Sequence, residues 1–196
     1  MKFFEDDDDE DTKKSDGEIL ITRMLKTRTI LLSGQINKDL AEKTIKQLLL
    51  LEEMGDDPIR VFIDSPGGDV DAGFAIFDMI RFVRPQVFTI GMGLVASAAA
   101  IIQLASPREQ RLGLPNSRYL IHQPLSGIRG VATDIEIHAK ELEDLREKLN
   151  RLIAHETGVS PEQVEKDTDR DYWMSAEEAV SYGLISRVIS KRDELA

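Results

Sequence analysis

Short apolar runs alternate with amphipathic segments over about residues 29–121, and this alternation constrains the fold more than any other feature of the sequence. The runs TILLSG, IRVFID, QVFTIGMG and RYLIHQP have the length and composition of buried strands. Between them, NKDLAEKTIKQLLLLEEMG and DAGFAIFDMIRFV have helical spacing, and the helices end near Gly55 and Pro85. This alternation predicts βαβ units with right-handed connections, and therefore an α/β fold with a largely parallel sheet.

The second half of the sequence predicts a long helix over about residues 133–156, which ends at Gly158. Its apolar residues form a stripe: Ile135, Ile137, Leu142, Leu145, Leu149 and Leu152. The pattern alone leaves open whether this stripe packs on the chain's own sheet or projects toward a partner chain.

Two capping boxes follow the long helix. We expect Ser160 and Ser175 to begin helices, with Gln163 and Glu178 reaching back to the capping residues.

The start of the chain differs in composition from the rest. Seven consecutive acids, Glu5–Asp11, repel one another and bury nothing, so residues 1–17 are expected to form a mobile acidic tail. Residues 18–196 are then long enough for one folded domain.

Composition excludes several function classes. The net charge of −11 disfavours nucleic acid as a partner, because phosphate binding needs clustered basic residues. The absence of cysteine excludes a thiol nucleophile and Cys-ligated zinc, and the three histidines do not have a metal-binding spacing. No run is long enough to span a membrane and no secretory signal opens the chain, so we expect a soluble cytoplasmic protein. Without a Walker motif, the chain should not hydrolyse ATP.

One hydroxyl, that of Ser97, interrupts the small and apolar run GLVASAAAIIQLA. Its position allows two interpretations. A lone serine in a core helix often hydrogen-bonds to its own backbone, whereas a serine between a strand and a helix can be a nucleophile.

A serine nucleophile needs a general base and a group that orients the base. His122 follows an apolar strand and precedes a loop, where α/β folds place reactive groups, although a lone histidine of this kind is more often structural. The segment DTDRDYW offers three candidate orienting acids, Asp167, Asp169 and Asp171, and spacing alone does not choose among them.

Acyl transfer also needs donors for the developing oxyanion. Gly67 and Gly68 of DSPGG can bring backbone N–H groups close to a substrate, although a plain glycine turn is an equally good interpretation. The N–H of Ala98, at the start of the helix after Ser97, is a second candidate.

In this order, DSPGG, GMGLVASAAA, LPNSRYLIHQP, ATDIEIHAKE and DTDRDYWMSAEEAVSYGLI resemble the ClpP serine peptidases over about residues 28–190. The resemblance implies a crotonase-like fold with the long helix as a handle. It assigns Ser97 as nucleophile, His122 as base and Asp171 as orienting acid, a set defined by geometry rather than by chain order. Gly68 and Ala98 match the family's oxyanion donors.

The resemblance also implies partners and an assembly. Heptameric rings would stack as a tetradecamer through the handle helix and through Asp169 and Arg170. A Clp/Hsp100 ATPase would feed unfolded protein into the chamber, so this chain would need no cofactor and no metal. The substrate would pair by β-addition with the segment that includes Leu125, Ser126, Gly127 and Ile128.

Three features depart from the family pattern. Ala98 and Ala99 stand where glycine or methionine is usual, which a backbone donor tolerates. Ser126 stands where glycine is common, which would restrict the substrate strand. The polyacidic start replaces a less charged segment that lines the entrance in the family.

Three other functions compete with an active peptidase. The first is a weakly active structural ring subunit that assembles with a more active paralogue. The second is an acyl-CoA enzyme of the crotonase fold, which shares glycine-rich donors but needs no Ser-His-Asp set. The third is a signal-peptide peptidase relative, which would use a Ser-Lys pair and a membrane anchor.

Overall fold

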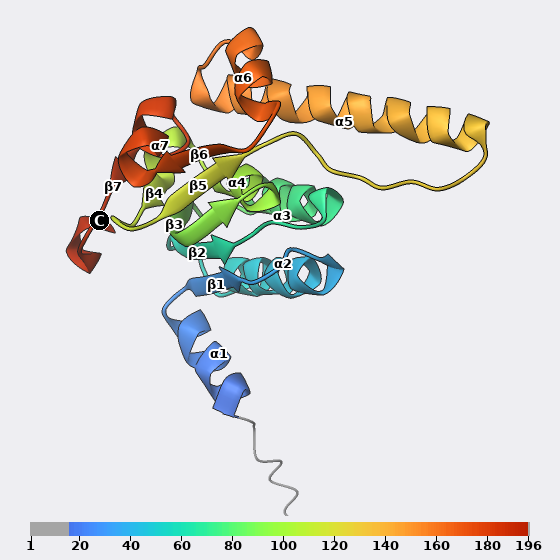
Figure 1. Ribbon diagram of the computed structural model, residues 1–196. Coiled ribbons are helices and arrows are strands. Elements are labelled where there is room, and N and C mark those ends of the chain that lie inside the picture. Colours follow the sequence, from blue (N-terminus) through green and yellow to red (C-terminus); the bar gives the residue numbers. More distant parts are fainter. Residues whose placement is uncertain (1–15, 196) are drawn as a thin grey trace, which may run out of the picture.

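The computed structural model describes residues 16–195, so residues 1–15 of the predicted acidic tail lie outside the described residues. The last two residues of that predicted tail, Asp16 and Gly17, instead begin a helix. Seven α-helices and seven strands are described (Figure 1). The helices are α1 (Asp16–Lys26), α2 (Lys38–Glu53), α3 (Val70–Phe82), α4 (Ala98–Gln103), α5 (Ala132–Thr157), α6 (Pro161–Thr168) and α7 (Ala176–Tyr182). The strands are β1 (Thr29–Ser33), β2 (Ile59–Ser65), β3 (Val87–Ala96), β4 (Arg111–Gly113), β5 (Arg118–Ile121), β6 (Tyr172–Ser175) and β7 (Arg187–Val188). Two 3₁₀ turns, η1 (Arg108–Gln110) and η2 (Arg192–Leu195), complete the set.

The sheet has the strand order β1-β2-β3-β4-β7, with all neighbours parallel. The long central strand β3 serves two partners: its first half pairs with β4 and its last residues, Leu94–Ala96, pair with β5. Strand β6 then pairs antiparallel with β5. Because β5 pairs with the carboxyl end of β3 and β6 runs antiparallel to β5, the residue that follows β5, His122, and the residue that precedes β6, Asp171, lie near residue 97.

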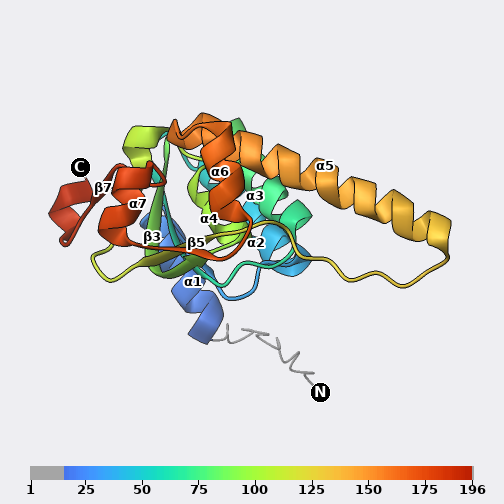
Figure 2. The ribbon, with the colours of Figure 1, turned by 45° about the horizontal axis from the view of Figure 1, so that its top comes forward.

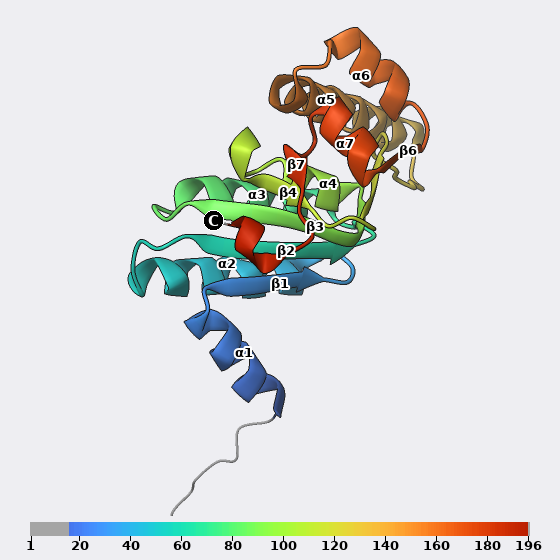
Figure 3. The ribbon, with the colours of Figure 1, turned by 90° about the vertical axis from the view of Figure 1, so that its left-hand side faces the viewer.

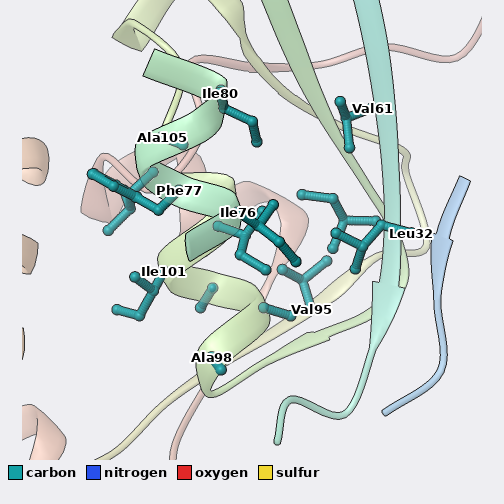
Figure 4. Packing of buried hydrophobic residues seen from close by; sticks show 14 of the residues in the cluster. Leu32, Val61, Ile76, Phe77, Ile80, Val95, Ala98, Ile101 and Ala105 are labelled. Carbon is teal, nitrogen blue, oxygen red and sulfur yellow. The ribbon is translucent and has the colours of Figure 1, made fainter. Parts of the chain in front are cut away.

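Amphipathic helices cover one face of this sheet. Asn37 and Asp69 begin α2 and α3, because their side chains accept hydrogen bonds from backbone N–H groups in the first turn. The apolar faces of these helices and the small residues of α4 pack on β1, β2 and β3 (Figures 3 and 4). The predicted βαβ arrangement is therefore the observed one.

The other face of the sheet is partly covered by the end of the chain. Figure 3 shows the C-terminal segment lying across this face. Leu195 in η2 and Ile189 after β7 pack on Ile90 and Leu112, and Phe62 borders this smaller cluster. Strands β4 and β6 and helix α1 were not among the elements that the sequence predicted.

The long helix α5 packs on the chain's own domain along only half of its length. Its carboxyl-terminal half packs on the domain and buries Leu149, Ile153 and Ala154. Its amino-terminal half projects away from the sheet, where Ile135 and Ile137 are 41% and 56% exposed (Figures 1 and 2). The apolar stripe is thus divided between the domain's own core and an open surface.

Of the two predicted capping boxes, one is complete. The Ser175 hydroxyl accepts from the Glu178 N–H, and the Glu178 carboxylate accepts from the Ser175 N–H. The prediction for Gln163 is wrong, because its side-chain amide donates to Asp167 at 2.7 Å instead of reaching back to Ser160. Ser160 nevertheless caps α6 with its hydroxyl.

Candidate active site

Ser97 lies in the sharp turn between the end of β3 and the start of α4. Its backbone has φ 58° and ψ −122°, a conformation that L-residues avoid, and its N–H donates to the Leu120 carbonyl at 2.9 Å. Ser97 is therefore outside α4, at the position that precedes its first residue, and the interpretation of this serine as part of a core helix is wrong.

His122 follows the last residue of β5 and faces this turn. Its Nε2 lies 2.8 Å from Ser97 Oγ, and its Nδ1 lies 3.0 Å from Asp171 Oδ1. The imidazole is 17% exposed, whereas the Asp171 carboxylate is 61% exposed in the single chain. The structure thus joins the hydroxyl, the imidazole and the carboxylate in one hydrogen-bonded row.

The three aspartates that the sequence could not distinguish have different contacts. Asp167 accepts from the Tyr182 hydroxyl at 3.0 Å. Asp169 lies 3.8 Å from Arg146, and its carbonyl accepts from the Gln123 amide at 2.6 Å. Among these three, it is the carboxylate of Asp171 that contacts the imidazole of His122.

Gln123 is a positioning residue that sequence reasoning missed. Its backbone N–H donates to the Thr168 carbonyl at 2.6 Å, and its side chain donates to the Asp169 carbonyl. These two bonds attach the loop before Asp171 to the residue that follows His122. The only signal in the sequence is that Gln123 is adjacent to His122.

The glycine pair after β2 packs directly against the Ser97 turn. A Cβ on Gly67 would lie 2.6 Å from the Ala96 carbonyl oxygen and 2.7 Å from Ser97 Cβ, so only glycine fits there. At Gly68, φ is +148°, and this residue forms a parallel bridge with Ile36. That bridge uses the Gly67 carbonyl and the Asp69 N–H, which leaves the Gly68 N–H without a backbone acceptor among the described residues.

Ala98 is the first residue of α4, so its N–H has no acceptor within the helix. The N–H groups of Gly68 and Ala98 thus have no backbone acceptor among the described residues, and the two segments that carry them meet at the Ser97 turn. Gly67, rather than Gly68, makes the close contact that brings the two segments together.

An apolar pocket of about 20 Å³ lies between Ser97 and the buried part of α5. Its wall consists of Val70, Ile101, Ile121, Pro124, Leu149 and Ile153. The pocket is too small for a large side chain unless Leu149 or Ile153 moves. A small apolar group bound here would lie beside the Ser97 hydroxyl.

The segment predicted to bind a substrate strand leads from His122 to α5 along the projecting helix (Figure 1). Leu125 and Ile128 are 82% and 39% exposed, and Ser126 and Gly127 are also exposed. No residue of 125–128 belongs to a strand in the single chain, so the backbone is open to pairing. Arg170, predicted at a ring contact, is exposed beside Asp171.

The described part of the chain offers neither a metal cluster nor a membrane span. Within residues 16–195, no group of three His, Cys, Asp or Glu side chains is arranged to hold a metal ion. No helix in this range has the length and apolar character needed to cross a membrane.

Comparison with known proteins gives consistent matches over nearly the whole chain. The sequence model of the family described as Clp protease matches residues 12–192. A Treponema denticola protein named "ATP-dependent Clp protease proteolytic subunit 2" is 59% identical over 197 residues, covering 100% of this chain and 98% of that protein. A Rhizobium meliloti protein named "ATP-dependent Clp protease proteolytic subunit 3" is 49% identical over 192 residues, covering 96% and 98%.

A solved structure is similar in fold. A point mutant of ClpP1 from Listeria monocytogenes superposes with a TM-score of 0.85 at 51% identity and covers 90% of this chain and 99% of that one. This similarity confirms the fold class that the sequence motifs predicted.

Proposed function

The chain belongs to the Clp protease family, and we propose that it is a serine endopeptidase, the proteolytic subunit of an ATP-dependent Clp protease. One observation carries the assignment of the chemistry. The Ser97 hydroxyl, both nitrogens of His122 and the Asp171 carboxylate are joined by contacts of 2.8 and 3.0 Å. This is the arrangement that activates a serine for acyl transfer.

Each group has one task in the proposed reaction. His122 Nε2 removes the proton from Ser97 Oγ as the oxygen attacks the peptide carbonyl, and Asp171 stabilises the imidazolium that forms. The N–H groups of Gly68 and Ala98 donate to the resulting oxyanion. His122 then gives the proton to the leaving amine, and water hydrolyses the acyl-enzyme with His122 again acting first as base and then as acid.

The apolar pocket beside Ser97 would receive the side chain that precedes the scissile bond. Its small volume favours small apolar side chains in the form described, and larger ones require α5 to move. The exposed backbone of Leu125–Ile128 would pair with the substrate chain by β-addition.

Exposed apolar residues support self-assembly. Leu125, Val131 and Ile137 are 82%, 67% and 56% exposed along the projecting half of α5 and the segment before it. A single chain that left this surface open would be prone to association. We propose that it is covered in stacked heptameric rings, a tetradecamer with Asp169 and Arg170 at the ring contact, and that an ATPase unfoldase of the Clp/Hsp100 type supplies unfolded protein.

The test compares initial rates of peptide hydrolysis by variants that have the same native mass and therefore the same oligomeric state. Ser97→Ala should lose at least about 10⁴-fold in rate, and His122→Ala nearly as much, because triad members act as a unit. Ser181→Ala, on the exposed side of α7, is the matched control and should keep full activity. A Ser97→Ala protein with most of its activity would overturn the assignment.

The runner-up function is a weakly active ring subunit that assembles with a more active paralogue. The short contacts within the row of Ser97, His122 and Asp171 favour the active subunit. Peptide hydrolysis by the pure chain distinguishes the two, since a structural subunit would cleave only after mixing with its paralogue.

A further inference from the structure

Two backbone contacts link the segment around His122 to the segment that carries its orienting acid. On one side of His122, Ile121 pairs with Tyr172 at the start of β6. On the other side, the Gln123 N–H donates to the Thr168 carbonyl at 2.6 Å. The imidazole and the carboxylate that it contacts therefore lie between these two contacts, and both contacts are needed to keep the two groups together.

The two contacts are supported differently. The contact of Tyr172 is one step of the regular ladder between β5 and β6, so the whole strand pair holds it. Thr168 is the last residue of α6, and its carbonyl therefore accepts no hydrogen bond from within that helix. This carbonyl is free to bind Gln123, but it does not belong to the sheet, so its position depends on how the side chain of Thr168 is held.

The side chain of Thr168 is anchored to the long helix α5. Thr168 is 0% exposed, and its hydroxyl donates to Asn150 Oδ1 at 2.8 Å and lies 2.9 Å from the Val164 carbonyl. Because water does not reach this hydroxyl, the protein must satisfy it, and the bond to Asn150 joins the end of α6 to α5. Figure 1 shows α6 lying beside the carboxyl-terminal half of α5.

Asn150 lies on a part of α5 that is packed into the domain. Its neighbour Leu149 is buried, as is Ile153 one turn later, and both line the apolar pocket beside Ser97. The anchor therefore connects the catalytic segments to the wall of this pocket. It lies within one chain and is separate from the proposed ring contact.

We propose that Asn150 and Thr168 are positioning residues for peptide hydrolysis. Their hydrogen bond holds the Thr168 carbonyl where it binds the Gln123 N–H, and this contact keeps the imidazole of His122 between the nucleophile and the orienting carboxylate. Without the bond the three reacting groups remain, but nothing enforces their separations of 2.8 and 3.0 Å. The inference rests on the proposed function, because it concerns the geometry of the same three groups.

The test measures kcat and KM for an acetylated trialanine aminomethylcoumarin amide with variants of the full chain that have the same native mass. Thr168→Val has nearly the same shape and keeps the backbone carbonyl, but it loses the hydroxyl. We expect kcat to fall by at least about ten-fold, because small misplacements are costly in catalysis, and KM to change by less than about two-fold. A merely structural role would lower the amount of folded protein and leave kcat per folded site unchanged.

Two variants control for packing. Thr168→Ser keeps the hydroxyl and should restore kcat to within about three-fold of the unsubstituted protein. Thr44→Val removes a hydroxyl that is also buried, at 1% exposed, and that also bonds to the carbonyl four residues earlier, that of Leu40, at 2.8 Å. This hydroxyl lies in α2, at the opposite end of the domain from α6 (Figures 1 and 3), so Thr44→Val should keep both constants.

A further variant tests the pair. Asn150→Leu keeps a similar side-chain volume but lacks the acceptor, and it should show the same fall in kcat. Because Asn150 is only partly buried, this variant carries the test even if Thr168→Val does not assemble. Either substitution removes the same bond, so the double variant should have a kcat within about two-fold of the lower single variant.

Three results would overturn the inference. They are an undiminished kcat in the Asn150→Leu protein, a loss in Thr168→Ser or Thr44→Val as large as that in Thr168→Val, and losses that multiply in the double variant. A failure of the proposed function is separate, because it would appear as hydrolysis of the same peptide by the Ser97→Ala protein.

Discussion

Replacing Ser97 with glycine should make the protein more stable than replacing it with alanine. Residue 97 has φ 58° and ψ −122°, the conformation of the first central residue of a type II′ turn, which glycine dominates. Alanine keeps the Cβ and therefore the strain, whereas glycine removes both. Both variants lose the hydroxyl and its contact with His122, so the comparison isolates the backbone.

The expected difference follows from three opposing contributions. Relief of the strained conformation stabilises the glycine variant by about 1–3 kcal/mol. The greater freedom of glycine in the unfolded chain costs about 0.5–1 kcal/mol, and loss of the half-buried Cβ costs less than about 0.8 kcal/mol. The net effect is about 1 kcal/mol in favour of Ser97→Gly, or roughly a five-fold change in the folding constant.

Urea unfolding of the two inactive variants measures this difference. The variants are compared at the same protein concentration and in the same oligomeric state, because assembly also contributes to apparent stability. Ala75→Gly on the exposed side of α3 is the control and should be destabilised by about 1 kcal/mol. Suppose that Ser97→Gly proved less stable than Ser97→Ala, by the same amount that Ala75→Gly destabilises α3. The turn at residue 97 would then carry no strain, and the reasoning would fail.

Three further predictions concern the same domain. Gly67→Ala should lower peptide hydrolysis by about 100-fold or more because its Cβ displaces the nucleophile's backbone, whereas Gly34→Ala, with φ +88° and open space, should keep its activity. Burial raises the pKa of Glu156, but hydrogen bonds from two arginines outweigh burial, so the pKa lies below its ordinary value of 4.5. The carboxylate therefore stabilises the folded state above pH 4.5, and this stabilisation is lost as the pH falls through the lowered pKa. Glu156→Gln should abolish this acid sensitivity in thermal unfolding and cost about 3–5 kcal/mol at neutral pH, because it leaves Arg111 buried without its partner; an unchanged acid profile would contradict the assignment. Leu149→Ala should enlarge the pocket beside the nucleophile and shift cleavage toward larger apolar side chains in a peptide series, at a cost of about 2–5 kcal/mol in stability; an unaltered preference would place that side chain elsewhere.

The alternation of strands and helices could be predicted because each element carries its own periodic signal. Strands β1, β2 and β3 are apolar runs, and α2 and α3 end near a glycine and a proline. The three-residue strand β4 is too short for any such signal. Helix α5 shows a different limit, since its apolar stripe is continuous in sequence but only half of it meets the domain.

The candidate site was only partly predictable from residues. A serine between a strand and a helix and a histidine at a strand end are local signals, whereas the choice of Asp171 over Asp167 and Asp169 depends on how a loop folds against His122. Distance along the chain hides such contacts: 49 residues separate His122 from Asp171, and 45 separate Arg111 from Glu156. The family resemblance supplied Asp171 where spacing could not.

The most direct test of the central claim is to locate the site of reaction with a serine-directed fluorophosphonate by intact-mass measurement and peptide mapping. If Ser97 is the nucleophile activated by His122, the native protein should gain one adduct per chain on Ser97. Labelling should be absent in Ser97→Ala and strongly slowed in His122→Ala. An adduct on another residue, or undiminished labelling of the Ser97→Ala protein, would contradict the account.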